Sequence, residues 1–172
     1  MGARTTAREA ALQMLFAMDA GAPSSAEQAA AGEGETPGAV DSAAVERLIV
    51  DFWRETPGDA EGRAYADDLV RSIGRDLAAT DALIRAASQN WRIERMTRVD
   101  RNVLRMGAWE LAHRDDVPRA VILDEAVEIA KRFGTEESGA FVNGVLDRIA
   151  DDCGRRDDDR DGGNGEERRD RD

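Results

Sequence analysis

The sequence contains very few of the residues that build covalent frameworks and metal sites. Cys153 is the only cysteine and His113 the only histidine among 172 residues. An intrachain disulfide framework, a cysteine-rich zinc site and a metal site with two histidines are therefore excluded.

Long apolar runs are absent as well. No segment approaches the roughly 20 apolar residues that a membrane span requires. Charged residues interrupt the first twenty positions, unlike a secretory signal peptide. Together with the low cysteine content, these features predict a cytoplasmic protein in a reducing compartment, with no membrane partner.

Signals for strands are also scarce, whereas signals for helices recur. Runs of β-branched residues and sustained period-two alternation are missing, and apolar residues return at helical spacing in seven segments. The expected helices cover about 4–20, 42–56, 61–76, a short segment after Thr80, 97–114, the stretch between Pro118 and Gly134, and 136–151. The pattern predicts an all-α bundle without a β-sheet.

Two segments differ in composition from this body. Residues 21–41 are rich in glycine, proline and alanine and are expected to form a flexible insertion. Residues 151–172 are acidic, lack large apolar side chains and are expected to be a disordered tail, which leaves a folded domain of residues 1–150. Residues 21–44 and the tail each carry a net charge of −4, so only −4 of the chain's −12 remains on the folded body.

No catalytic constellation emerges from the sequence. His113 is followed by Arg114 and two aspartates, as at a solvated helix end, and Cys153 has no neighbouring base. The acidic pairs are adjacent in sequence, so on a helix their side chains point about 100° apart. Phosphate-binding glycine loops and zinc-ligand spacings are absent. We expect no enzyme activity, cofactor, metal or small-molecule substrate.

A row of arginines marks the segment 97–114. Arg98, Arg101 and Arg105 fall within about 60° of arc on a helix, opposite the apolar residues Val103 and Met106. This basic face is either a solvated outer surface or a surface for phosphates or an acidic protein.

The first expected helix carries two arginines in line. Arg4 and Arg8 are four residues apart, on roughly the side that carries Leu15. Either the start of this helix projects past the bundle and meets anionic partners, or the two side chains cover the end of the bundle.

Two inward polar features stand out nearer the C-terminus. Glu110 shares the apolar arc of Val103 and Met106, so it should be largely buried and should need a partner. The pair Asn143-Gly144 interrupts the last helix, where glycine costs roughly 1 kcal/mol relative to alanine, and a close helix contact is the plainest reason for it.

Five stretches keep the order and spacing of a known pattern. They read Ala-Arg-Glu-Ala-Ala-Leu-Gln-Met-Leu-Phe (7–16), Val-Asp-Arg-Asn-Val-Leu-Arg-Met-Gly-Ala-Trp-Glu-Leu (99–111), Asp-Val-Pro (116–118), Asp-Glu-Ala-Val-Glu-Ile-Ala-Lys-Arg-Phe-Gly (124–134) and Phe-Val-Asn-Gly-Val-Leu-Asp (141–147). Together they resemble the NusB family of transcription antitermination factors.

The resemblance implies a fold and a function. It implies two packed helical subdomains, about 1–76 and about 80–150. It further implies binding of boxA-type single-stranded RNA together with the small-subunit ribosomal protein NusE. That complex joins elongating RNA polymerase and other Nus factors and suppresses termination, chiefly in ribosomal RNA operons.

The resemblance also implies roles for individual positions. The residues that match the RNA-contacting positions are Arg4, Arg8, Glu137 and Phe141. The residues that match the NusE-facing region are Phe16, Asp100 and Arg101. The start of this chain has only two arginines, so we expect its own affinity for RNA to be weak.

Two other functions share these features. The same fold occurs before RNA cytosine methyltransferase domains. This chain has no room for such a domain, so this alternative requires the chain to be the RNA-binding module of such an enzyme. A helical adaptor that binds only proteins is the alternative from a different class, and RNA binding with and without NusE separates it from the antitermination factor.

Overall fold

The computed structural model describes residues 2–21 and 39–156. In this part of the chain it has seven α-helices, one short 3₁₀ helix and no strand, as the sequence predicts. The helices are α1 (Ala3–Ala20), α3 (Ser42–Glu55), α4 (Ala60–Arg75), α5 (Leu77–Ala87), α6 (Arg98–His113), α7 (Arg119–Phe133) and α8 (Ser138–Asp152), with η1 (Ile93–Arg95) between α5 and α6. None of the described helices is long and apolar enough to cross a membrane.

Side-chain caps mark the starts of three helices, α3, α4 and α6. The Thr97 side chain accepts a hydrogen bond from the backbone N–H of Asp100 at 3.1 Å, which confirms the predicted start of α6. Asp59 caps α4 in the same way through the N–H of Gly62. α5 begins at Leu77, so the expected start after Thr80 is wrong: Thr80 is buried inside this helix.

The last helix differs from expectation in two respects. α8 begins at Ser138 instead of directly after Thr135, because the N–H of Thr135 donates to Ser138 Oγ and holds the preceding turn. The pair Asn143-Gly144 does not interrupt α8, and a Cβ placed on Gly144 would meet no atom within 4 Å. The expected close helix contact at this pair is therefore wrong.

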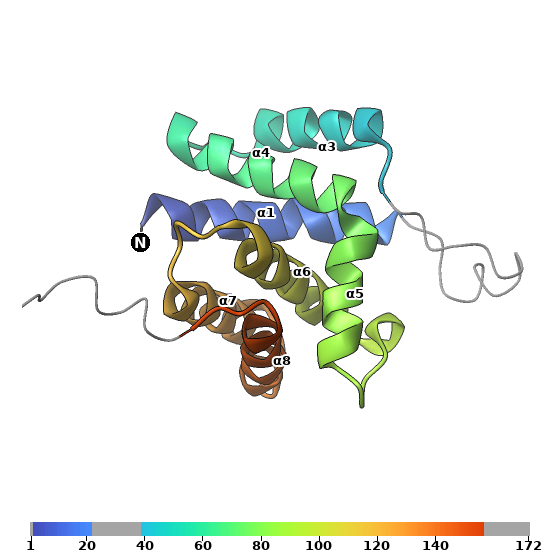
Figure 1. The fold of residues 1–172 in the computed structure, drawn as a ribbon. Coiled ribbons are helices and arrows are strands. Elements are labelled where there is room, and N and C mark those ends of the chain that lie inside the picture. The colour runs from blue at the N-terminus through green and yellow to red at the C-terminus, as the bar shows by residue number, and fades with distance from the viewer. Residues whose placement is uncertain (1, 22–38, 157–172) are drawn as a thin grey trace, which may run out of the picture.

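α6 is the central element of the core. It packs against α1, α5, α7 and α8, while α1 also packs against α4 (Figure 1). Gly107 allows the close approach of α8, since a Cβ there would lie 2.6 Å from Cδ1 of Leu146. The amphipathic faces predicted from the sequence meet around this helix, with Leu104, Leu111 and Leu146 nearly inaccessible to solvent.

The two segments of unusual composition lie largely outside the described residues, which leave out 22–38 and 157–172. The beginning of the expected tail is ordered, because α8 extends to Asp152 and residues 153–156 follow it along the body. Arg155 donates hydrogen bonds to the carbonyls of Leu111 and Arg114, both at 3.1 Å, and to that of Val117. The expectation of disorder from residue 151 is therefore wrong up to residue 156.

Candidate RNA and partner surfaces

Arg8 lies inside the bundle, not on its surface. Its side chain donates to both carboxylate oxygens of Glu110, from Nε at 2.9 Å and from Nη2 at 2.8 Å, and to the hydroxyl of Tyr65 at 3.1 Å. Only 4% of Arg8 is exposed. This corrects the expectation that Arg8 projects from the helix start and contacts RNA phosphates: α4 and α6 cover this turn of α1, and α6 supplies the counter-charge.

Glu110 is buried and paired, as the sequence predicts. It is 1% exposed, and both of its oxygens accept from Arg8. Burial disfavours the charged guanidinium of Arg8, but the hydrogen bonds and charge of Glu110 outweigh that penalty and raise the pKa of Arg8. The two side chains therefore form an internal ion pair that joins α1 to α6.

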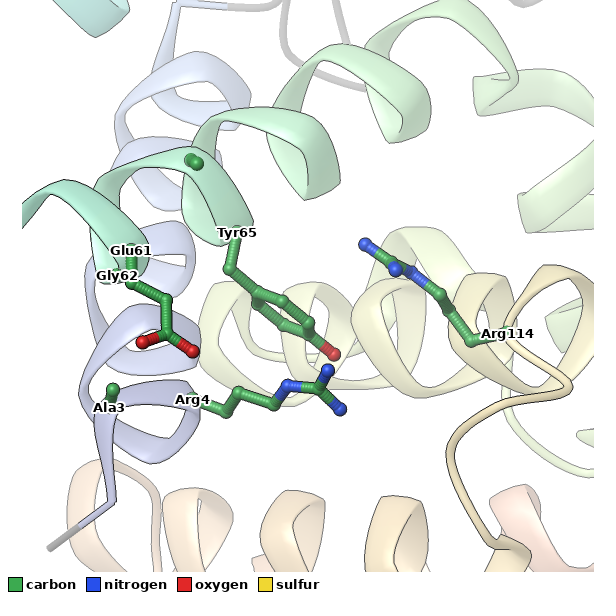
Figure 2. Close-up of a pocket in the computed structure, with 7 residues that line it drawn as sticks. Ala3, Arg4, Glu61, Gly62, Tyr65 and Arg114 are labelled. Atoms are coloured by element: carbon green, nitrogen blue, oxygen red, sulfur yellow. The ribbon is translucent and has the colours of Figure 1, made fainter.

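Arg4, unlike Arg8, is exposed and borders a pocket beside Tyr65. The pocket has a volume of about 260 Å³ and lies between the start of α1, the first turns of α4 and the end of α6 (Figure 2). Its lining residues are Ala3, Arg4, Glu61, Gly62, Ala64, Tyr65 and Arg114. The structure thus places the predicted RNA contact Arg4 at a concave site.

Three guanidinium groups surround the ring of Tyr65. The Cζ atoms of Arg4, Arg8 and Arg114 lie 5.2, 5.3 and 5.0 Å from the ring centroid. Burial and the carboxylate of Glu110 raise the pKa of the Tyr65 hydroxyl, against the opposing effect of the arginines. The hydroxyl therefore stays protonated at neutral pH and can donate a hydrogen bond.

The predicted RNA contacts Glu137 and Phe141 lie together at the start of α8. Glu137 is exposed, Phe141 is half-buried, and the N–H of Phe141 donates to the carbonyl of Glu137 at 3.1 Å. Within the described residues, no hydrogen bond or ion pair joins this turn to Arg4. The structure therefore brings Glu137 and Phe141 together, and neither residue lines the pocket that Arg4 borders.

The arginine row on α6 is not a basic outer face. Arg101 donates to Asp19 at 2.9 and 2.7 Å, and Arg105 donates to Asp81 at 2.8 and 3.0 Å. Both arginine side chains are at most 13% exposed. Both interpretations of the row are therefore wrong for Arg101 and Arg105, because carboxylates on α1 and α5 close over them; Arg98 alone remains exposed.

Two of the three predicted partner contacts are consequently internal. Arg101 also donates to the carbonyls of Ile93 and Met96 and thus holds the loop before α6. Asp100 is 9% exposed, which corrects the expectation that it presents its charge to a basic partner. Phe16 is 40% exposed, and the guanidinium of Arg98 lies 5.9 Å from the centroid of its ring. Phe16 is therefore the predicted partner contact that a protein can reach.

Sequence reasoning gave no binding role to two residues of the pocket or to one exposed ring elsewhere. Tyr65 falls within the expected helix 61–76 and Arg114 at the expected solvated helix end, and only their approach across α4 and α6 reveals the pocket. Trp91 is 62% exposed in the loop after α5. A tryptophan between Asn90 and Arg92, in a polar stretch outside every predicted helix, was the available signal.

The two residues considered for catalysis have structural contacts. His113 stacks on Trp109 with ring centroids 4.8 Å apart, and its Nδ1 lies 3.0 Å from the Trp109 carbonyl. Burial, followed by the charge of Asp152, raises the pKa of the Cys153 thiol, which opposes thiolate chemistry. Across residues 2–21 and 39–156, no group of three possible metal ligands is present.

Comparisons with known proteins agree with this architecture. Residues 5–151 match the model of the NusB family. The transcription antitermination protein NusB of Sorangium cellulosum is 62% identical over 93% of this chain and all of its own length, and that of Geobacter sulfurreducens is 46% identical over 87% of this chain and 95% of its own.

Solved structures show the same fold. A crystal form of NusB from T. maritima, 35% identical, superposes with a TM-score of 0.66 over 86% of this chain and 90% of that protein. A chain from a complex of NusB and NusE with double-stranded RNA, 26% identical, superposes with a TM-score of 0.67 over 87% of this chain and 97% of its own. The chain described here belongs to the NusB family.

Proposed function

We propose that this chain is a transcription antitermination factor. It binds boxA-type single-stranded RNA together with the ribosomal protein NusE and joins elongating RNA polymerase and other Nus factors in the cytoplasm, chiefly on ribosomal RNA operons. The observation that carries the proposal is the near full-length identity with proteins named for antitermination. The superposition on a chain solved with NusE and RNA supports the two partners.

The architecture supports a binding role without catalysis. The exposed Arg4 and the half-buried Phe141 supply a cation and an aromatic ring, the two side-chain types that bind single strands. We assign RNA contact to Arg4, Glu137 and Phe141, and NusE contact to the ring of Phe16. Arg8 and Arg101 support these surfaces from inside through their ion pairs with Glu110 and Asp19, and Asp100 is buried.

Both halves of the body contribute RNA contacts in this proposal, and the N-terminal half also carries the NusE contact. The N-terminal half, about 1–76, carries Arg4 and Phe16, and the C-terminal half, about 80–150, carries Glu137 and Phe141. The buried pair of Arg8 and Glu110 fixes the two halves relative to each other. An RNA that contacts both halves therefore binds Arg4, Glu137 and Phe141 in fixed relative positions.

A binding titration tests the proposed function. Labelled boxA RNA and a permuted RNA of the same composition are titrated with the chain and NusE from the same organism, and fluorescence anisotropy is measured. The function predicts clearly tighter binding of boxA RNA. Equal affinity for the two RNAs refutes boxA recognition. Binding of NusE with no measurable binding of either RNA favours the protein-only adaptor instead.

A further inference from the structure

The pocket beside Tyr65 contains hydrogen-bond donors that the fold leaves unused. Within residues 2–21 and 39–156, Arg4 forms no ion pair and the hydroxyl proton of Tyr65 has no acceptor, since that hydroxyl only accepts from Arg8. Arg114 Nη2 donates to Asp68 Oδ2 at 2.9 Å, but that carboxylate is 54% exposed. Figure 2 shows the guanidinium group of Arg4 close to the hydroxyl end of Tyr65 and the side chain of Arg114 reaching toward Tyr65 from the end of α6.

The charge of the pocket is positive at its inner end. Arg8 is neutralised by Glu110, so the uncompensated charge comes from Arg4 and in part from Arg114. The acidic group that lines the pocket is Glu61, which is exposed. An anion that enters therefore meets two guanidinium groups and one hydroxyl donor.

The shape of the pocket suits a small anionic group that belongs to a polymer backbone. The methyl groups of Ala3 and Ala64 and the backbone of Gly62 line it and leave a volume of about 260 Å³. The pocket lies next to the start of α1, where the exposed Arg4 is accessible to single-stranded RNA. Guanidinium pairs match the oxygens of a phosphate group, and phosphate contacts fix the register of a nucleic acid on a protein.

We propose that the pocket formed by Arg4, Tyr65 and Arg114 binds one phosphate group of the single-stranded RNA backbone. This rests on the RNA binding proposed above and adds Tyr65 and Arg114 to its contacts. Arg114 leaves or shares its bond to Asp68 when the phosphate enters, so Asp68 competes with RNA for the same guanidinium. The loop behind Arg114 is already held by Arg155 through the carbonyls of Leu111 and Arg114, which keeps the pocket in place.

Removal of the Arg114 charge is the first test. Arg114→Gln, assayed with boxA RNA and saturating NusE, should weaken binding about fivefold and reduce the slope of log affinity against log salt by about 0.7, the value for one phosphate on a single strand. RNAs with a single neutral methylphosphonate linkage locate the contact. One linkage should weaken the wild-type complex and should weaken the Arg114→Gln complex by a smaller factor, because Arg4 and Tyr65 still contact that phosphate.

Two further variants act without removing a cation. Asp68→Asn frees Arg114 and should tighten RNA binding, by more than the control Asp51→Asn, which removes an equal charge from the exposed pair with Arg54 on α3. Ala64→Leu fills the pocket and should weaken binding. Ala82→Leu changes an exposed alanine on α5 and should leave binding unchanged.

The outcomes separate this proposal from the function on which it rests. If wild-type protein and NusE bind boxA RNA but Arg114→Gln and Ala64→Leu bind it equally well with an unchanged salt slope, the phosphate site is refuted and the function stands. If inorganic phosphate shifts the NMR signals of the pocket while those two variants keep full RNA affinity, the pocket is a site for the free ion and the proposal is overturned. If wild-type protein binds no RNA even with NusE, both proposals fail.

Discussion

The buried pair of Arg8 and Glu110 gives the sharpest stability prediction. Glu110→Ala removes the carboxylate that accepts two hydrogen bonds from Arg8, at 2.9 and 2.8 Å, in a site where the two residues are 4% and 1% exposed. The guanidinium then stays buried without its main counter-charge. The remaining acidic neighbour is Glu125, whose Oε2 lies 3.8 Å from Arg8 Nη1.

The expected loss of stability is large for one side chain. Breaking a buried ion pair by removing one partner costs about 3–5 kcal/mol. The nearby Glu125 offsets part of this, so we expect about 3 kcal/mol, a substantial share of the roughly 5–15 kcal/mol that stabilises a domain. With a urea slope of about 2 kcal/mol per molar, the midpoint should fall by about 1.5 M.

Urea unfolding followed by circular dichroism measures this loss, and two variants control it. Asp51→Ala breaks a pair whose side chains are 71% and 72% exposed and should change the stability by less than about 1 kcal/mol. The double variant Arg8→Met with Glu110→Leu removes both charges and should recover most of the loss. A Glu110→Ala protein within about 1 kcal/mol of wild type would refute the reasoning, as would a double variant no more stable than the single one.

Three other positions give expected outcomes for pH dependence, packing and partner binding. Hydrogen bonds from Arg75 lower the pKa of Asp76, so the charged carboxylate of Asp76 contributes to stability above about pH 4, and this contribution is lost as the pH falls through the lowered folded-state pKa. In urea titrations, Asp76→Asn should therefore lose less stability than wild type between pH 5 and pH 2. An equal loss for the two proteins would contradict this prediction. Gly107→Ala places a Cβ 2.6 Å from Cδ1 of Leu146 and should lower the free energy of unfolding by about 1–3 kcal/mol in the same urea assay. An unchanged urea midpoint would mean that α6 and α8 can move apart at little cost. Phe16→Ala should weaken NusE binding at least about fivefold in calorimetry with an unchanged melting temperature, and full affinity excludes this ring from the interface.

Features that depend only on residues close together in the sequence were predictable from it. The start of α6 follows from Thr97, whose hydroxyl group caps the helix, and the end of α7 follows from the glycine at position 134. The burial of Glu110 follows from the arc it shares with Val103 and Met106, because a helical wheel fixes which residues face inward.

Features that depend on distant partners were not predictable in this way. The arginines of α6 look like an outer face on a helical wheel, but Asp19 and Asp81 come from 82 and 24 residues away to pair with Arg101 and Arg105. Arg8 likewise finds Glu110 across 102 residues. A single helix does not reveal which of its charged residues another helix will cover, and the pocket beside Tyr65 needs three elements at once.

The most direct test of the proposed function is the coupling between RNA and NusE. Three titrations are needed: boxA RNA with the chain alone, NusE with the chain alone, and boxA RNA with the chain saturated by NusE. A folded body of low net charge with a sparse arginine start should bind RNA weakly by itself, because cations supply most of the sequence-independent affinity. We predict that NusE raises the affinity for boxA RNA at least tenfold, or about 1.4 kcal/mol of coupling, with the reciprocal gain for NusE when RNA is bound. Equal RNA affinities with and without NusE would contradict the account.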